Sequence, residues 1–323
     1  MPTRREFVQV TAAAGAFAAV STTLPAFETP AGLSAVPSAT PEFGGPICFF
    51  SKHLPDLDGR GMARALTPLG FGGVDLTVRP KGHVEPARVR ELLPVFVNAI
   101  REEGLQVPMI TTDLHAEAEP AAAPTLETAA ALKIPFFKPG YYYYAFVDVR
   151  KELADASAKL RSLAALSAKH RVRLGFHNHA GYVGGGVWDI APAIDGLDRE
   201  WAGYYFDVRH AVVEGGDGGW RSAFNLAAPR LQMIALKDFY WEKNAAGAWR
   251  QQNCPMGEGM VPWKAFFAAL AKSGFNGPVS LHLEYAIPGA TPAAVQDNTL
   301  AAAARDLAFV KKGLGEAYGA SPP

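Results

Sequence analysis

Two stretches decide how this chain folds: RLGFHNHAGYVGGG at residues 173–186 and AGYYFDVRH at residues 202–210. In each stretch a short apolar run ends in polar side chains that can bind a metal or a substrate. These side chains are His177, Asn178 and His179 after the first run, and Asp207, Arg209 and His210 after the second. Buried strands that deliver such residues at their carboxyl ends are typical of the active sites of α/β barrels. We therefore expect the rest of the chain to supply six more strands around this pair.

From Pro46 onward, short apolar runs alternate with helical spacing of apolar residues. The expected strands are residues 46–50, 73–76, 106–110, 134–138, 172–176, 203–206, 231–236 and 279–283. The expected helices are residues 61–66, 86–103, 125–132, 148–170, 220–228, 262–272 and 291–313, with a kink or break at Pro94. This alternation predicts a single-domain (β/α)8 TIM barrel. A doubly wound open sheet is the alternative, but Ser51-Lys52-His53 stands where that fold has a glycine-rich turn.

The composition is that of a globular protein without a basic face. The 323 residues include 31 Lys or Arg and 31 Asp or Glu, so the formal net charge is zero, and we expect no nucleic-acid partner. Hydrophobic residues make up 49%, enough for a sizeable core. Cys48 and Cys254 are the two cysteines. We expect them to be unpaired, although an oxidising compartment could join them.

The first residues indicate an export signal. Thr3-Arg4-Arg5-Glu6-Phe7-Val8 is a twin-arginine pattern, and an uncharged, Ala-rich run too short for a convincing membrane span follows it. We expect a signal peptide at residues 1–27, a linker at 28–45, the barrel at 46–314 and a tail at 315–323. The mature protein would then be periplasmic or secreted, without a membrane span. A phosphorylated metabolite would be scarce there, which favours an unphosphorylated substrate.

Ionisable side chains stand at the ends of the expected strands, and three of them suit a metal. His177 and His179 are two residues apart on one strand, so both can point to the same side. Imidazole nitrogens and the Asp207 carboxylate suit Zn²⁺, Mn²⁺, Co²⁺ or Fe²⁺ better than Mg²⁺ or Ca²⁺. The residue types predict a divalent metal held by His177, Asp207 and His282, on the fifth, sixth and eighth strands.

Four short motifs carry a family resemblance. They are His177-Asn178-His179, Asp207-Val208-Arg209-His210, Ala235-Leu236-Lys237-Asp238 and Gly257-Glu258-Gly259. In these motifs the chain resembles the sugar phosphate isomerase/epimerase-like proteins of the xylose isomerase-like superfamily, from about Pro46 to Gly313. There are two departures from the family pattern. Ala235 stands where the seventh strand normally has a histidine ligand, and His282 stands where the eighth strand has a glutamate.

The resemblance implies an isomerase, an epimerase or a related keto-sugar lyase that abstracts a proton next to the carbonyl of a sugar. Glu284 or Lys237 would be the catalytic base. Three protein ligands and an open position would still make a workable metal site. Barrels of this kind often pair, so a homodimer is a further expectation. The residues expected to bind substrate are Lys52, His53, Arg79, His179, His210, Tyr142 and Trp263.

Two alternatives stay open at this point. Because Ala235 cannot coordinate a metal, the chain could be a secreted, non-catalytic carbohydrate-binding barrel that has lost its metal site. An abasic-site endonuclease shares this barrel architecture. The neutral charge, the export signal and the scarcity of His and Glu ligands argue against the endonuclease.

Overall fold

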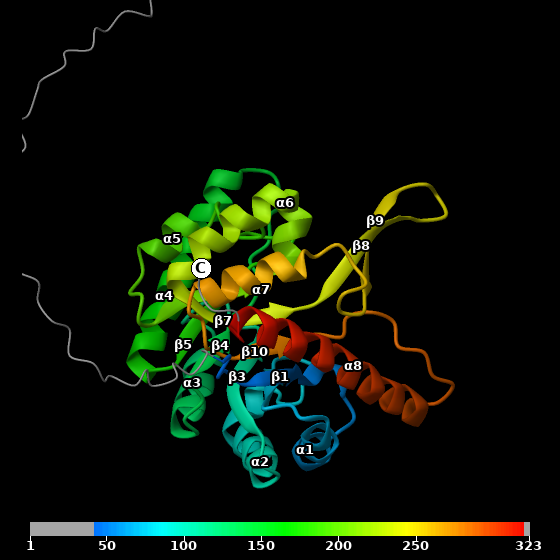
Figure 1. Ribbon diagram of the computed structural model, residues 1–323. Coiled ribbons are helices and arrows are strands. Elements are labelled where there is room, and N and C mark those ends of the chain that lie inside the picture. The colour runs from blue at the N-terminus through cyan, green and yellow to red at the C-terminus, as the bar shows by residue number, and fades with distance from the viewer. Residues whose placement is uncertain (1–41, 320–323) are drawn as a thin grey trace, which may run out of the picture. The chain divides into compact units, whose positions relative to one another are not determined.

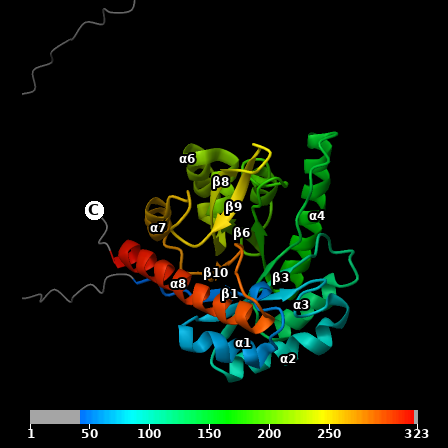
Figure 2. The ribbon, with the colours of Figure 1, turned by 90° about the vertical axis from the view of Figure 1, so that its right-hand side faces the viewer.

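Eight parallel strands close into a barrel that is surrounded by helices, which confirms the predicted (β/α)8 TIM barrel (Figure 1). The computed structural model describes residues 42–319, so the expected signal peptide lies outside the described residues. Around the barrel the hydrogen-bonded order is β1-β10-β7-β6-β5-β4-β3-β2. Figure 2 shows α1, α2 and α3 on one side of the barrel and α6 and α7 on the other.

The barrel strands are β1 Ile47–Phe50, β2 Gly73–Val78, β3 Gln106–Thr112, β4 Phe136–Lys138, β5 Arg173–His177, β6 Ala202–Asp207, β7 Leu231–Leu236 and β10 Val279–Leu281. The two strands outside the barrel are β8 Asp238–Lys243 and β9 Trp249–Cys254. The α-helices are α1 Gly59–Leu66, α2 Val89–Glu102, α3 Ala122–Ala131, α4 Val149–His170, α5 Ala191–Asp195, α6 Val208–Ala227, α7 Trp263–Lys272 and α8 Pro292–Gly319. The short 3-10 helices are η1 Ser51–His53, η2 Thr67–Leu69, η3 Pro86–Arg88 and η4 Ala228–Arg230.

Side chains fill the interior of the barrel. Met109, Tyr205, Met233 and Ala235 form one buried cluster there. A Cβ at Gly175 would overlap the Met233 side chain, so the glycine in β5 makes room for it. The filled interior leaves the carboxyl ends of the strands as the place for a site.

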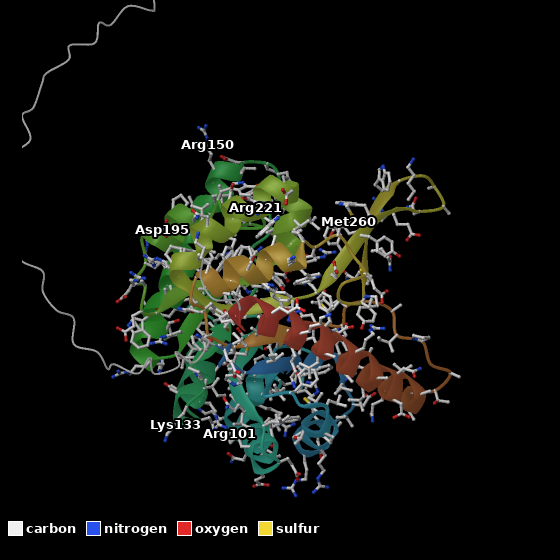
Figure 3. The ribbon with its side chains drawn as sticks, viewed as in Figure 1. Arg101, Lys133, Arg150, Asp195, Arg221 and Met260 are labelled. Carbon is white, nitrogen blue, oxygen red and sulfur yellow. The ribbon has the colours of Figure 1, made fainter. Side chains whose placement is uncertain are left out.

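Charged side chains gather on the outer surface. Figure 3 labels Arg101, Arg150 and Arg221, which belong to α2, α4 and α6 outside the barrel. Cys48 and Cys254 are buried and unpaired. Among residues 42–319, none of the helices combines the length and the apolar character that a membrane crossing needs.

The expected break at Pro94 is wrong, because α2 runs from Val89 to Glu102 without interruption. Proline removes one backbone donor from a helix interior. Leu93, Val97 and Ile100 are buried on the inner face of α2. Their packing outweighs the lost hydrogen bond and holds the helix together.

The chain between β6 and α7 differs most from expectation. Helix α6 starts directly after Asp207 rather than near Trp220, and it bends at Gly216, which has a φ of 59°. Strands β8 and β9 form an antiparallel hairpin that was not expected, and it projects beyond the ring of helices (Figure 1). The Asn244 N–H donates to the Ala248 carbonyl to close the turn.

The last barrel strand and the last helix do not end at the expected residues. Strand β10 ends at Leu281 rather than at residue 283. His282 and Glu284 therefore follow the strand instead of lying within it. Helix α8 continues beyond Gly313 to Gly319, into the segment expected to be a tail.

Candidate active site

Asp207 is the centre of a buried polar group at the carboxyl ends of the strands. It is the last residue of β6, and its Oδ1 accepts a hydrogen bond from the His210 N–H in the first turn of α6. Its Oδ2 lies 3.3 Å from His177 Nε2, 3.7 Å from His210 Nε2 and 3.3 Å from Lys237 Nζ. Burial opposes ionisation of Asp207, but the neighbouring Lys237 charge and His177 hold its pKa well below the usual value. Asp207 is thus a carboxylate at neutral pH.

His177, Asp207 and His210 could hold a metal ion. Each offers one ligand atom, and these atoms lie within 4.8 Å of one another. His210 Nε2 is buried and has no hydrogen-bond partner among the described residues. Burial lowers the pKa of His177 to about 4 and that of His210 well below 6.5, so both imidazoles are neutral, the form that binds metals. Two nitrogens and one oxygen fit a divalent cation with an open position.

Two further residues fix the orientation of this group. The Tyr141 hydroxyl lies 3.0 Å from His177 Nδ1 and so turns the other ring nitrogen toward Asp207. The Asn178 side chain donates to the Asp207 carbonyl at 2.9 Å and accepts from the Asp207 N–H at 2.8 Å. These contacts tie β5 to β6 at the site. Partners of this kind orient ligands in metal sites.

His282, expected to be the third ligand, does not join the group. Its ring stacks on Phe50 with 4.3 Å between the ring centroids. Its Nε2 lies 3.1 Å from both the Tyr205 hydroxyl and Ser280 Oγ, so this nitrogen points into the barrel. The residue that lies with His177 and Asp207 is His210, which was expected to bind substrate.

Lys237 reaches into the space beside Ala235. Ala235 pairs in register with Asp207, so the two side chains point to the same side of the sheet. Ala235 is too short to reach the carboxylate. Lys237 lies two residues further along and comes within 3.3 Å of Asp207 Oδ2 and 3.4 Å of Glu284 Oε2. A buried ammonium group therefore bridges the two carboxylates.

Glu284 and Lys52 complete this side of the site. Glu284 Oε1 lies 3.2 Å from Lys52 Nζ, and the Glu284 side chain is 22% exposed. Burial would raise the pKa of Glu284, but the charges of Lys237, His282 and Lys52 hold it well below its ordinary value. Glu284 is therefore ionised and reachable from the mouth of the barrel.

Of the other residues expected to bind substrate, some lie at the site and others hold the neighbouring segments in place. The His179 ring lies 3.8 Å from the His210 ring, at the mouth of the barrel. The Arg79 guanidinium lies 5.7 Å from the centre of the Phe50 ring. His53 Nε2 accepts the Leu283 N–H at 3.1 Å, so His53 braces the segment that carries Glu284.

A protein-family model described as "Xylose isomerase-like TIM barrel" matches residues 63–312. The chain belongs to this family. A comparison with curated protein sequences gives no match.

Solved structures of the family share the fold at low sequence identity. D-psicose 3-epimerase of Clostridium cellulolyticum H10, solved with D-tagatose, is 12% identical with a TM-score of 0.62, over 83% of this chain and 99% of that one. A xylose isomerase-like protein of Mycobacterium smegmatis, solved in complex with magnesium, is 14% identical with a TM-score of 0.63, over 85% and 98%. L-ribulose 3-epimerase is 16% identical with a TM-score of 0.62, over 84% and 95%.

Two residues expected to bind substrate in this xylose isomerase-like barrel are placed elsewhere. The Tyr142 hydroxyl donates to the His115 carbonyl at 2.7 Å, and the neighbouring Tyr141 contacts His177 in its stead. Trp263 is buried, and its Nε1 donates to Asp238 Oδ2 at 2.7 Å. Both aromatic residues support the loops around the site.

Asp238 organises the loop that carries the family motif Gly257-Glu258-Gly259. Its two carboxylate oxygens accept the backbone N–H groups of Phe239, Gly257, Gly259 and Val261. Together with Trp263, these donors satisfy a fully buried carboxylate. The residue is therefore a structural support.

Asp238→Ala is expected to lower the free energy of unfolding by about 3 kcal/mol, because several buried donors lose their acceptor. Trp263→Phe removes one donor and keeps an aromatic ring, although a smaller one, and Asp238 keeps its backbone donors, so the effect should be smaller. Urea unfolding of the two variants measures the difference. Equal stability of Asp238→Ala and the wild type would contradict this role.

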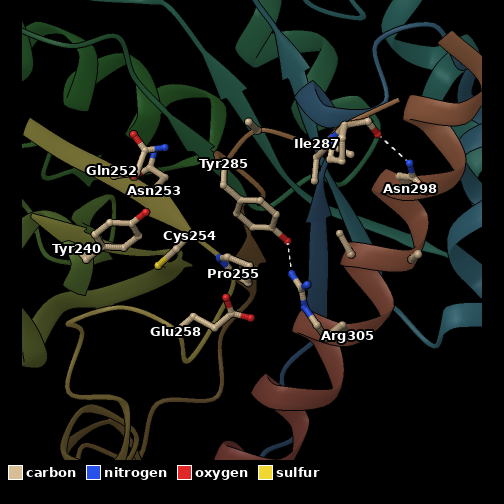
Figure 4. Close-up of a pocket in the computed structure, with 14 residues that line it drawn as sticks. Tyr240, Gln252, Asn253, Cys254, Pro255, Glu258, Tyr285, Ile287, Asn298 and Arg305 are labelled. Atoms are coloured by element: carbon tan, nitrogen blue, oxygen red, sulfur yellow. Dashed lines mark hydrogen bonds between the residues drawn. The ribbon is translucent and has the colours of Figure 1, made fainter. Parts of the chain in front are cut away.

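A cavity of about 510 Å³ lies beside the polar group rather than within it, between the β8–β9 hairpin and α8 (Figure 4). Tyr285 points into it, and Arg305 Nη2 donates to the Tyr285 hydroxyl at 2.8 Å. Glu258 also lines this cavity. The carboxylate of the Gly257-Glu258-Gly259 motif therefore faces a different space from Asp207.

The buried histidines make stability pH-dependent. Burial lowers the pKa of His53 and His177 to about 4 and that of His179 to about 3, against 6.5 in the unfolded chain. Between pH 6.5 and 4 the unfolded chain binds more protons, so the free energy of unfolding rises with pH in this window. Burial raises the pKa of Asp75 to about 6. This one carboxyl group acts in the opposite direction to the histidines, because its folded form holds the proton to higher pH.

The metal-free protein is therefore expected to melt at progressively lower temperature as the pH falls from 7 to 4. Thermal unfolding in chelator across this range measures the trend. A melting temperature that stays constant or increases as the pH is lowered from 6.5 to 4.5 would contradict this expectation.

Proposed function

We propose that this chain is a metal-dependent isomerase or epimerase that abstracts a proton next to the carbonyl of a sugar. One observation carries the proposal: the buried His177–Asp207–His210 group adjoins the Lys237–Glu284 ion pair at the carboxyl ends of the barrel strands. The epimerases among the structural neighbours support a sugar substrate. Loss of a leaving group next to the same carbon would give the related lyase reaction.

A bound divalent cation would supply Lewis-acid stabilisation of negative charge at the sugar oxygen. Glu284 is the proposed base, because its carboxylate is partly exposed and lies beside the donor group, 3.4 Å from Lys237. Lys237 holds Glu284 in place and can donate a hydrogen bond to the oxygen where charge develops. His179 and Lys52 lie at the mouth of the barrel and are proposed to bind sugar hydroxyls.

Removing the metal is expected to stop proton exchange. The full chain, loaded with Mn²⁺ or Zn²⁺, would be incubated with ketohexoses in D2O, and deuterium next to the carbonyl would be followed by NMR. We expect exchange and a change of configuration, a rate at least about a hundredfold lower after chelation, and recovery when the metal returns.

Two outcomes would contradict this function. Exchange that is unaffected by chelation would remove the metal from the mechanism. Chelator-insensitive sugar binding without any exchange would favour the non-catalytic carbohydrate-binding barrel that Ala235 suggests.

The cellular setting is also proposed. The twin-arginine pattern at Arg4 and Arg5 supports export to the periplasm or the medium, and hence an unphosphorylated substrate. Cell fractionation tests the export. The expected homodimer stays a prediction that light scattering can test.

A further inference from the structure

Four cations at the mouth of the barrel fall into two groups, apart from Arg209, which contacts Asn253 and the Phe239 ring. Lys52 and Lys237 lie within 3.4 Å of Glu284, and Lys237 also pairs with Asp207. Arg79 and Lys138, on the other hand, form no ion pair within residues 42–319. The second pair is held by aromatic rings rather than by carboxylates.

Lys138 is a buried cation that faces the interior. It is the last residue of β4 and is only 2% exposed. It pairs in register with Thr111, whose hydroxyl donates to the buried Asp75, so Lys138 and Thr111 point to the same side. Its Nζ lies 3.4 Å from the centre of the Tyr141 ring. Burying an ammonium group without a counter-ion is costly, so this position favours an external anion.

Arg79 lies two strands away from Lys138 in the barrel order, because β3 alone separates β2 from β4. It follows the last residue of β2, and its guanidinium sits 5.7 Å from the centre of the Phe50 ring. Burial and, after it, the positive charge of Arg79 lower the pKa of Lys138 to about 7, the direction expected from repulsion between two positive charges. An anion between them would relieve that repulsion.

The nearby carboxylates Asp113 and Asp75 raise the pKa of Lys138, but neither forms an ion pair with it among the described residues. Asp75 accepts hydrogen bonds from Thr111, Tyr205 and Ser280, so hydroxyl groups occupy its oxygens. Asp113 follows β3, and its side chain is 50% exposed. Arg79 likewise forms no ion pair with either carboxylate in the described part of the chain.

We propose that Arg79 and Lys138 form a subsite for an anionic group on the sugar, so that the preferred ligand is a sugar acid rather than a neutral sugar. The inference rests on the proposed function, which gives a sugar as the substrate, and adds that this sugar carries a negative charge. In the barrel order, β4 is four strands from β10 in either direction, so Lys138 lies across the mouth from Glu284. An anion held at Lys138 leaves the rest of the sugar directed toward Glu284.

The test compares D-glucuronate, D-glucose 6-phosphate and D-glucose by calorimetric titration of the full chain in chelator, where no turnover occurs. We expect D-glucuronate to bind about tenfold or more tightly than D-glucose. Tighter binding of D-glucose 6-phosphate than of D-glucuronate would assign the subsite to a phosphate and contradict the sugar acid. Arg79→Gln and Lys138→Met are each expected to reduce the preference about tenfold.

Lys264→Gln is the matched control, because it removes an exposed lysine from α7, away from the mouth, and should leave the preference intact. Lys138→Met keeps the length of the side chain and removes a buried unpaired charge, so it should fold; its melting temperature checks this. Equal affinity for anionic and neutral sugars, no binding of any of the three, or a preference that survives in both variants would overturn the inference.

The two proposals fail separately. If only the anion subsite is wrong, metal-dependent proton exchange of neutral ketohexoses remains. If only the proposed function is wrong, the anion preference remains and the exchange is absent.

Discussion

Asp207→Asn is expected to weaken divalent metal binding at least about a hundredfold and to abolish measurable proton exchange into sugars. Asp207 is the one carboxylate in the donor group with His177 and His210. It also carries the negative charge that faces Lys237 at 3.3 Å. Asparagine keeps the shape but removes this charge, so the ammonium group of Lys237 would repel the cation. Calorimetric titration with Mn²⁺ and exchange in D2O measure both effects.

The fold should survive this change, because asparagine is also a good N-cap for α6. Circular dichroism checks that the barrel forms. Asp113→Asn is a matched control, since Asp113 follows a barrel strand and belongs to no described donor group. Metal affinity of Asp207→Asn equal to that of the wild type would remove Asp207 from the site.

Glu284→Gln is expected to slow proton exchange about 10²- to 10⁴-fold while leaving the metal content unchanged. Glu284 is ionised and partly exposed, and it is absent from the donor group around Asp207. Glutamine keeps the size of the side chain and one accepting oxygen for a lysine, but it loses the second acceptor and cannot take a proton. Rates measured by NMR, beside metal analysis of the same preparation, separate catalysis from binding.

Glu258→Gln is the matched control for this change. Glu258 belongs to a family motif, but it lines the outer cavity next to α8. The exchange rate of Glu258→Gln should equal that of the wild type. A Glu284→Gln enzyme with the wild-type rate would show that another group is the base, with Lys237 the next candidate.

The barrel and the centre of the site could be predicted from the sequence. Parallel strands put their carboxyl ends on one face, so polar residues that follow apolar runs must meet there. His177, Asp207, Lys237 and Glu284 lie together as this argument requires. The first half of α6 was not predicted, because the glycines and polar residues around Gly216 interrupt the helical spacing of apolar residues.

The choice of the third donor depended on three-dimensional detail. His210 lies three residues after Asp207, and only the helix that begins at Asp207 brings its ring back beside the carboxylate. His282 follows the end of β10, where its Nε2 is drawn toward Tyr205 and Ser280. Such hydrogen bonds between distant strands leave no pattern in the sequence.

The run of tyrosines from 141 to 144 shows the same limit. It follows a strand without the regular alternation of a strand, so nothing in the sequence decides which ring faces the site. In the structure Tyr141 contacts His177, whereas Tyr142 contacts a backbone carbonyl. Residues in irregular loops can be assigned only after the loop is placed.

His177, Asp207 and His210 are proposed to bind one divalent ion. Anomalous diffraction from crystals of the Zn²⁺-loaded protein, recorded at the zinc absorption edge, tests this proposal most directly. We expect a single strong peak about 2.0–2.2 Å from His177 Nε2, Asp207 Oδ2 and His210 Nε2. No peak at the mouth of the barrel, or a peak bound to His282 and not to His210, would contradict it.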